Sequence, residues 1–371
     1  MCPFDRQGVN VLGAARQPLG KVSALARLAV IGVALAAVGG TFAYLGGWFT
    51  PNALTPARFT DAFEHVYGVH AGFRRNHAKG VGVSGVFESN GNGVRLSEAV
   101  VFRPGRVPVI GRFSLGGGQP YVGDTPDAVR GLGLQFSLPD GELWRTAMIN
   151  LPVFPVSTPE AFYQLLIASK PNPVTSKPDP ARMEAFFARH PGSVKALAVI
   201  KSQPVSSGFG NSTFHGLNAF RFSNRAGDSV PVRWVMTPMQ PFEAASPGPP
   251  QGKNFLFDGL IAAIHRRPLQ WRLVVIIGQP GDPTNDASVA WSAERQQVDV
   301  GTVTLDRVES DETSAAAGIN FDPLVLPAGI TPSDDPLPSA RSAVYSQSFT
   351  RRVGEAKPPS AITPADVGGG N

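Results

Sequence analysis

Residues 74–88 read RRNHAKGVGVSGVFE, in which a histidine leads into a strand punctuated by glycines. The apolar residues Val81, Val83 and Phe87 keep the period of two that indicates a strand. Glycines in such a strand leave room for a large, flat group to approach its other face. Taken alone, His77 also fits a structural histidine at the edge of a sheet, so its role depends on the rest of the chain.

Strand-like runs separated by turns continue through the chain, and with this segment they number about eight. The others are 107–114, 131–138, 142–149, 216–223, 230–237, 270–277 and pieces of 288–307. Helical patterns occupy 56–67, 159–168, 180–201 and 254–266, and a short one lies around 339–351 in an extended C-terminal arm. The order of these runs predicts an antiparallel sheet or barrel with helices around it, an α+β arrangement.

Composition and missing motifs exclude several classes of protein. The chain has 371 residues, of which 42% are hydrophobic and 16% charged, so it can bury a large core. Its net charge of +5 forms no basic stripe, and no nucleic-acid partner is expected. Cys2 is the only cysteine, which excludes a disulfide framework, a zinc ribbon and an iron–sulfur cluster. Serine-elbow hydrolases, nucleotide enzymes and zinc enzymes are disfavoured because their motifs do not occur.

The N-terminal region contains an uncharged stretch, LAVIGVALAAVGGTFAYLGGWF, at residues 28–49. Its 22 residues suffice to cross a hydrocarbon layer about 30 Å thick. Four basic residues and one acidic residue precede it, and this bias keeps the N-terminus in the cytoplasm. We therefore expect a cytoplasmic segment at 1–27, a transmembrane anchor at 28–49 and one domain at 50–371. A cleaved signal peptide and a buried core helix remain the alternatives.

Several motifs, taken in order, carry a resemblance to a known family. The sequence resembles the haem catalase family, in its short branch of catalase-related peroxidases. Residues 74–88 match the family's R-x-x-H-A-K/R-G-x-G-x-x-G-x-F-E nearly throughout, and R-F-S stands at 112–114. Residues 128–136 and 149–154 correspond to P-x-R-G-x-x-x-x-F and N-N-x-P-x-F. The family's R-x-x-x-Y motif stands at 341–345, so the resemblance runs from about residue 54 to 356.

The resemblance implies a catalase-type antiparallel β-barrel of about eight strands, with surrounding helices, and heme b as cofactor. It implies that Tyr345 is the tyrosinate ligand of the iron, with Arg341 one helical turn earlier favouring the phenolate. His77 then acts as the catalytic base, and Ser114 holds its ring. The further cofactor-binding residues that the resemblance implies are Arg74, Arg112, Phe154, Phe162, Arg341 and Arg352.

One position departs from the family pattern. The family's distal asparagine is the first residue of N-N-x-P, and that position, three residues before Pro152, is Ile149 here. Either the loop shifts to bring Asn150 into the pocket as a catalytic group, or the pocket lacks the amide; we favour the second. Asn218 stands at the approximate position of a family histidine that contacts the proximal arginine, so a bond to Arg341 is expected.

The resemblance implies a haem peroxidase that reduces hydrogen peroxide or organic hydroperoxides with a small-molecule electron donor, and the departure at Ile149 predicts weak catalase activity at most. We expect a single-pass protein of the bacterial inner membrane with a periplasmic catalytic domain. A second copy of the chain is a further candidate partner, which would make the protein a homo-oligomer. The alternatives are an enzyme that rearranges fatty-acid hydroperoxides on the same fold, a non-catalytic haem-binding protein, and a haem-free barrel that binds an apolar ligand.

Overall fold

The computed structural model describes residues 21–45, 53–246 and 252–368, which fall into two units divided between Thr55 and Pro56. The first unit contains α1 (Lys21–Leu45), whose segment Ser23–Tyr44 is long and apolar enough to cross a membrane. A membrane anchor and a signal sequence would both have this length and composition. The helix begins seven residues before the predicted span at 28–49, and residues 46–49 lie outside the described residues.

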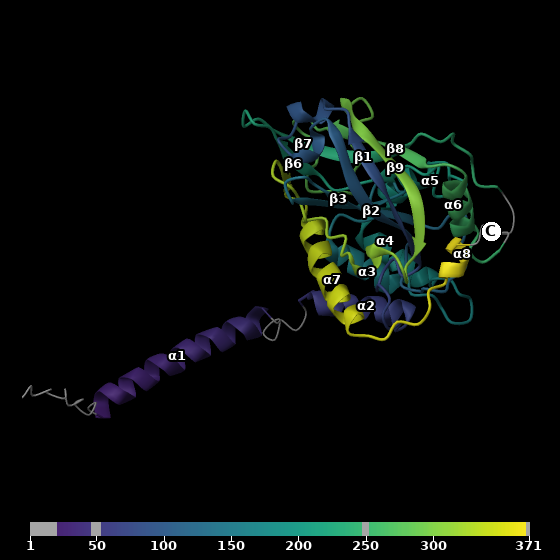
Figure 1. Cartoon of the computed structure of the whole chain (residues 1–371). Helices are drawn as coiled ribbons and strands as arrows, with labels where there is room; N and C mark the ends of the chain where they lie inside the picture. Colours follow the sequence, from purple (N-terminus) through teal and green to yellow (C-terminus); the bar gives the residue numbers. More distant parts are fainter. Residues whose placement is uncertain (1–20, 46–52, 247–251, 369–371) are drawn as a thin grey trace, which may run out of the picture. The chain divides into compact units, whose positions relative to one another are not determined.

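The second unit is built on a ten-stranded antiparallel sheet (Figure 1). Its strands are β1 (Gly80–Ser89), β2 (Gly105–Leu115), β3 (Arg130–Ser137), β4 (Leu143–Ile149), β5 (Phe214–His215), β6 (Phe220–Ser223), β7 (Ser229–Pro238), β8 (Leu269–Ile277), β9 (Gln297–Ser310) and β10 (Ile330–Pro332). Eight strands close in the order β7-β5-β4-β3-β2-β1-β9-β8, because β8 pairs back to β7. β6 also pairs with β7 and carries β10. The predicted antiparallel barrel is confirmed.

The barrel interior is filled by alternate residues of each strand, as the strand period requires. In β4 the buried residues alternate with half-buried ones, and Trp144 lies inside. Its ring stacks on Phe136 at 4.8 Å between centroids, and Phe136 meets Phe87 edge-on at 5.4 Å. These large rings occupy the inner space, so a ligand of comparable size has to bind against the outer face of the wall.

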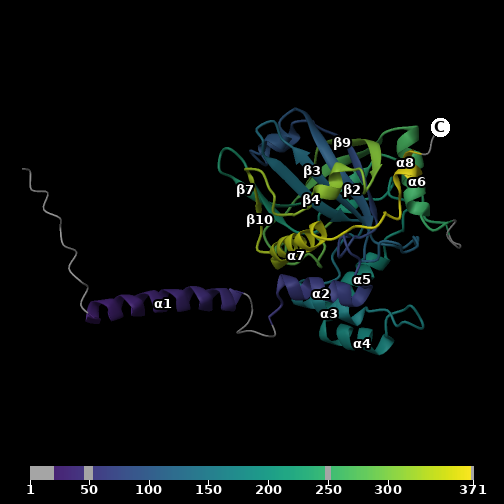
Figure 2. The ribbon, with the colours of Figure 1, turned by 60° about the horizontal axis from the view of Figure 1, so that its bottom comes forward.

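Helices pack outside the barrel, and α2 contacts both α3 and α7 (Figure 2). The helices of this unit are α2 (Pro56–Tyr67), α3 (Pro159–Ala168), α4 (Pro180–Arg189), α5 (Pro191–Lys201), α6 (Phe255–Arg266), α7 (Pro336–Val353) and α8 (Pro364–Gly368). Two 3₁₀ turns, η1 (Asn92–Arg95) and η2 (Val100–Phe102), lie between β1 and β2, and η3 (Ala315–Gly318) follows β9. Both α2 and α3 have the predicted bounds.

Most predicted strands are shifted at their ends by a residue or two, and three predicted elements differ from the structure for a clear physical reason. A single helix at 180–201 is wrong, because Pro191 has no N–H to continue α4 and instead begins α5. The predicted strand at 216–223 is interrupted at Leu217, whose φ of 64° lies outside the strand region, so β5 and β6 form instead. The helix expected around 339–351 begins earlier, at Pro336, because the Asp335 side chain caps it.

Candidate active site

His77 lies immediately before β1, against the outer face of the barrel wall. Its Nδ1 is 3.1 Å from Ser114 Oγ on β2. Gly131 on β3 faces the same ring, and a Cβ atom there would stand 2.9 Å from His77 Nδ1. Only a glycine lets the imidazole lie this close to the strand. The predicted pairing of His77 with Ser114 is therefore present in the geometry.

Burial lowers the pKa of His77 to about 3, and the positive charges of Arg112, Arg341 and Arg74 contribute to this shift. The imidazole is therefore neutral at physiological pH and able to accept a proton. Arg341 belongs to α7, whereas Arg74 and Arg112 flank the histidine. The His77 segment also contacts α7 directly, because Arg75 N donates a hydrogen bond to Ser348 Oγ of α7 at 3.3 Å.

The backbone of His77 is held by a residue that sequence reasoning missed. His77 has a φ of 57°, a left-handed conformation that is uncommon for a residue other than glycine. The Asn76 side-chain oxygen accepts hydrogen bonds from His77 N at 3.0 Å and from Gly117 N at 2.8 Å. Ala78 N donates to the Gly117 carbonyl at 3.0 Å. An asparagine directly before a candidate catalytic histidine was the available signal, because asparagine readily satisfies local backbone donors.

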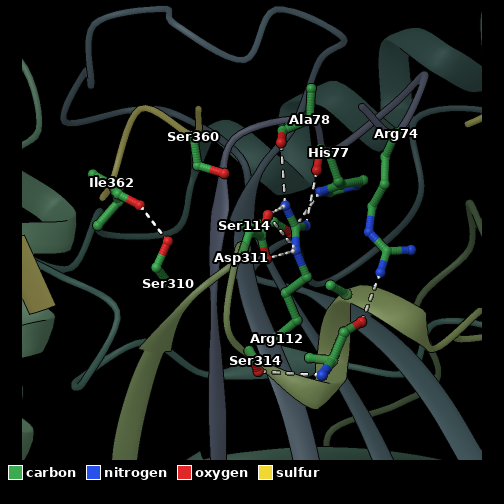
Figure 3. A network of polar contacts seen from close by, with 12 residues as sticks. Arg74, His77, Ala78, Arg112, Ser114, Ser310, Asp311, Ser314, Ser360 and Ile362 are labelled. Atoms are coloured by element: carbon green, nitrogen blue, oxygen red, sulfur yellow. Dashed lines mark hydrogen bonds and ion pairs between the residues drawn. The ribbon is translucent and has the colours of Figure 1, made fainter. Parts of the chain in front are cut away.

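Arg112 is the first of three arginines beside the His77 segment. Its Nε and Nη2 donate to the carboxylate of Asp311, at 2.9 and 2.7 Å, and its Nη1 donates to the His77 carbonyl at 2.8 Å (Figure 3). Nη2 also reaches the Ala78 carbonyl at 3.2 Å. Burial alone would raise the pKa of Asp311, but Arg112 outweighs burial and holds it below its usual value. Asp311 thus fixes the orientation of the Arg112 guanidinium, and no sequence motif pointed to this partner.

Arg74 and Arg352 complete this cationic cluster. Arg74 donates to the carbonyls of Ala316 and Ile319 at 3.0 and 2.9 Å, and Arg352 donates to the Ala317 carbonyl at 2.7 Å. Among the described residues, the buried Nη2 of Arg352 has no hydrogen-bond partner. Burial and the neighbouring arginines lower the pKa of both groups, that of Arg352 to about 10.

A small cavity opens beside this cluster. Arg74, Asp311, Arg352 and Lys357 are among the residues that line it. Three cations against one carboxylate leave an excess of positive charge, and the buried guanidinium nitrogen without a partner needs a hydrogen-bond acceptor. The cavity is therefore suited to carboxylates of a bound molecule.

Tyr345 and Arg341 lie together on the face of α7 that meets the barrel wall. Arg341 Nη2 is 3.4 Å from the Tyr345 hydroxyl and 3.0 Å from the Ala147 carbonyl of β4. Its Nη1 donates to the Asn218 side chain at 2.6 Å, as the loose alignment predicted. Asn218 in turn donates to Asp335 at 2.8 Å. These bonds fix the guanidinium beside the phenol.

Asn150 does not point its amide oxygen toward His77. That oxygen accepts a hydrogen bond from Arg130 N at 2.8 Å, at the start of β3. The strand register instead places Ile149 opposite Gly131, in the row that also contains Ser114. Residues directly opposite in neighbouring strands point to the same face. The His77 ring covers Gly131, and Ile149 is therefore the neighbouring side chain on the same face of the sheet.

An apolar surface continues from Ile149 through Phe154 to Phe162. Ile149 and Phe154 pack against a cluster of Leu217, Ala287 and Leu337. Phe154 also meets Phe162 of α3, with 5.2 Å between the ring centroids. The structure therefore brings the two predicted phenylalanines together, and they join the wall that begins at Ile149.

Comparison with known proteins gives one consistent result. The family model described as Catalase matches residues 50–358. A catalase-related peroxidase of Synechococcus elongatus is 37% identical over 87% of this chain and 96% of that protein. A catalase-related peroxidase of Mycolicibacterium paratuberculosis is 34% identical over 82% of this chain and 96% of that protein.

A solved structure supports the fold. A bacterial catalase structure superposes with a TM-score of 0.68 at 22% identity, over 82% of this chain. The aligned region spans 62% of that longer chain, so the likeness concerns the barrel architecture alone.

Proposed function

This chain belongs to the catalase family, in its catalase-related peroxidase branch, and on that premise we propose that it is a haem-dependent peroxidase. It reduces hydrogen peroxide or organic hydroperoxides and takes the electrons from an external small-molecule donor. The observation that carries the proposal is that the His77–Ser114 pair, the arginine cluster and the Arg341–Tyr345 pair lie on segments that contact one another.

The residues present fit a haem. Tyr345 would ligate the haem iron in this proposal, and the Arg341 guanidinium lies 3.4 Å from its hydroxyl. Arg74, Arg112 and Arg352 take the propionates, and the unpaired Nη2 of Arg352 supports this assignment. When bound, haem supplies an iron that can accept the oxidising equivalents of a peroxide.

His77 carries the proton transfers. The contact to Ser114 Oγ fits an imidazole that donates from Nδ1 and keeps its lone pair on Nε2. A neutral imidazole takes the proton from the incoming hydroperoxide and returns it to the oxygen that leaves, so water or an alcohol departs instead of an anion. Ser114 fixes the tautomer, and Asn76 fixes the backbone from which the ring projects.

Ile149 favours peroxidase over catalase activity. A second hydrogen peroxide molecule, which catalase turnover requires, would gain from a polar group beside His77. Isoleucine offers no donor there, and the Asn150 side-chain oxygen accepts a hydrogen bond from Arg130 N. The apolar surface formed by Ile149, Phe154 and Phe162 instead accommodates an alkyl group, which supports organic hydroperoxides as substrates.

The N-terminal helix anchors the enzyme in the bacterial inner membrane, with the catalytic unit in the periplasm. The apolar length of Ser23–Tyr44 and the basic residues before it support this orientation.

An absorption spectrum of the purified full-length chain, produced with ample haem, tests the proposal. We expect a Soret band, its loss or displacement in Tyr345→Phe, and retained haem without turnover in His77→Ala. Assays with and without a reductant separate a peroxidase from an enzyme that rearranges fatty-acid hydroperoxides. Absence of a Soret band would exclude the proposal, and full activity of His77→Ala would remove the role given to that residue.

A further inference from the structure

Arg75 is buried in an ion-pair network that the proposed chemistry does not use. Its side chain is only 4% exposed, and each of its guanidinium nitrogens donates a hydrogen bond. Nε donates to Glu64 at 2.7 Å, whereas Nη1 and Nη2 donate to the two carboxylate oxygens of Glu355 at 2.9 and 2.5 Å. Nη1 also donates to the Phe73 carbonyl at 3.0 Å. This bidentate geometry is the strongest that arginine makes with a carboxylate.

The network extends in both directions from Arg75. Arg351, near the end of α7, is 3.2 Å from Glu64 and 2.7 Å from Asp61, both on α2. On the opposite side, Glu355 also accepts a hydrogen bond from Gly72 N at 2.7 Å. We name these side chains the clasp, which consists of Asp61, Glu64, Arg75, Arg351 and Glu355.

The clasp lies next to both halves of the proposed haem site. Arg75 is two residues before His77, and its own backbone N donates to Ser348 Oγ at 3.3 Å. Ser348 lies one helical turn after Tyr345 on α7. The clasp therefore joins α2, the segment that carries His77 and the helix that carries Tyr345. Arg75 is thus two residues from His77, and its hydrogen-bond partner Ser348 is three residues from Tyr345.

The clasp depends on its charges. Burial opposes the charge on Arg75, but the hydrogen bonds to Glu355 and Glu64 outweigh burial and raise the pKa of Arg75. The hydrogen bond from Arg75, in turn, lowers the pKa of Glu355. Removing one partner of such a pair leaves a buried charge without compensation, which is more disruptive than replacing both partners.

We propose that Arg75 is a positioning residue, which holds the His77 segment against α7 at the spacing that retains haem. This inference rests on the proposed function, because it assumes that haem binds between His77 and Tyr345. It predicts that the clasp controls how fast haem leaves the protein, although no clasp residue is given a contact with haem.

The test is haem transfer from the full-length holoprotein to excess apomyoglobin. We expect the rate to rise at least about tenfold in Arg75→Met and severalfold in the milder Glu355→Gln, which keeps an oxygen for Gly72 N. The double variant should transfer haem no faster than Arg75→Met, because the two residues act as one unit. Arg106→Met is the matched control, since Arg106 pairs with Glu88 on the surface and is 69% exposed; its rate should equal that of the parent.

The pH profile separates positioning from a general loss of stability. The groups that face Glu355 are Arg75 and Arg351, with Glu64 beyond Arg75 on α2. Because the Glu355 pKa is lowered in the folded protein, its contribution is complete above the usual carboxyl range and is lost as the pH falls through the lowered value. Haem release from the parent should therefore accelerate as the pH falls, and this acceleration should be absent in Glu355→Gln.

Three outcomes would overturn the inference. The first is transfer from both variants at the rate of Arg106→Met. The second is an unchanged acid profile in Glu355→Gln together with a lowered urea midpoint, which would reduce the clasp to a structural role. The third is a parent protein that takes up no haem, and that result alone would also remove the proposed function.

Discussion

At the scale of single residues, His77 is defined by the low pKa that burial and three arginines impose on it. A base with a pKa of about 3 stays unprotonated far below the ordinary histidine value of about 6.5. We therefore expect kcat/KM for a hydroperoxide to stay level from pH 8 to about pH 5 and to fall only in stronger acid, because only there does protonation remove the base. A stopped-flow pH series on the holoenzyme measures this.

The control for this prediction is Arg74→Gln, which removes one of the charges that depress the His77 pKa. The acid limb should then move to higher pH, toward the ordinary histidine value. A parent profile that already falls near pH 6.5 would show that the site does not hold His77 neutral in the way inferred.

Ile149 gives the second prediction. Ile149→Asn should raise oxygen evolution from hydrogen peroxide relative to oxidation of a dye donor, because it supplies a donor beside His77. A preorganised donor commonly changes a rate by about 10²–10³, which sets the upper limit of the effect. Both assays on the same preparation give the ratio. If the ratio is unchanged, and Asn150→Ala in the parent abolishes activity, then Asn150 fills that role despite its bond to Arg130.

The site residues that the sequence could predict are those within short motifs. His77, Arg341 and Tyr345 were predicted because their neighbours in the chain belong to the same motifs. Asp311 and Glu355 were not, because each acts on an arginine about 200 or more positions away. No local sequence pattern predicts such a partner, because the two residues come together only in the folded barrel.

At the scale of elements, α7 is tied to the barrel wall at its first turn. Asp335 caps the helix through one carboxylate oxygen, at 2.9 Å from Leu337 N, and accepts from Asn218 with the other. We expect Asp335→Ala to cost about 1 kcal/mol for the lost cap. It should also displace the Soret band, because Asn218 holds Arg341. Urea unfolding and absorption spectra of the same variant measure the two effects.

Asp179→Ala is the matched control for that variant. Asp179 caps α4 in the same way, at 2.9 Å from Ala181 N, and it has no link to Arg341. It should lower stability by a similar amount and leave the spectrum unchanged. Equal spectra in the two variants would mean that the Asp335–Asn218 bond does not influence the tyrosine.

The elements that the sequence predicted best have clear ends. Pro56 and Pro159 begin α2 and α3 at the predicted residues, because proline suits the first turn of a helix. The same preference applies at Pro191, which begins α5 inside the single helix that was predicted at 180–201. Leu217 shows the other limit, since nothing in its side chain predicts a left-handed conformation.

At the scale of the whole molecule, the fate of the N-terminal helix is the fourth prediction. Anchoring predicts that the full-length chain stays in the membrane pellet after carbonate washing, and that its N-terminal peptide remains attached. A periplasm-specific reporter fused after Asn371 should be active. A mature protein that begins after residue 45 and remains in the soluble fraction would identify α1 as a cleaved signal sequence.

The position of β1 between β2 and β9 has a consequence for biosynthesis. β2 follows β1 closely, but β9 joins it through pairs such as Ser84 with Arg307. Because α7 comes after β9, a growing chain holds its histidine long before its tyrosine exists. At about 5–20 residues per second, the ribosome needs on the order of tens of seconds to cross that interval. Until β9 has been synthesised, the nascent polypeptide therefore exposes the glycine-containing edge of β1 that β9 later covers, and Tyr345 follows only after that.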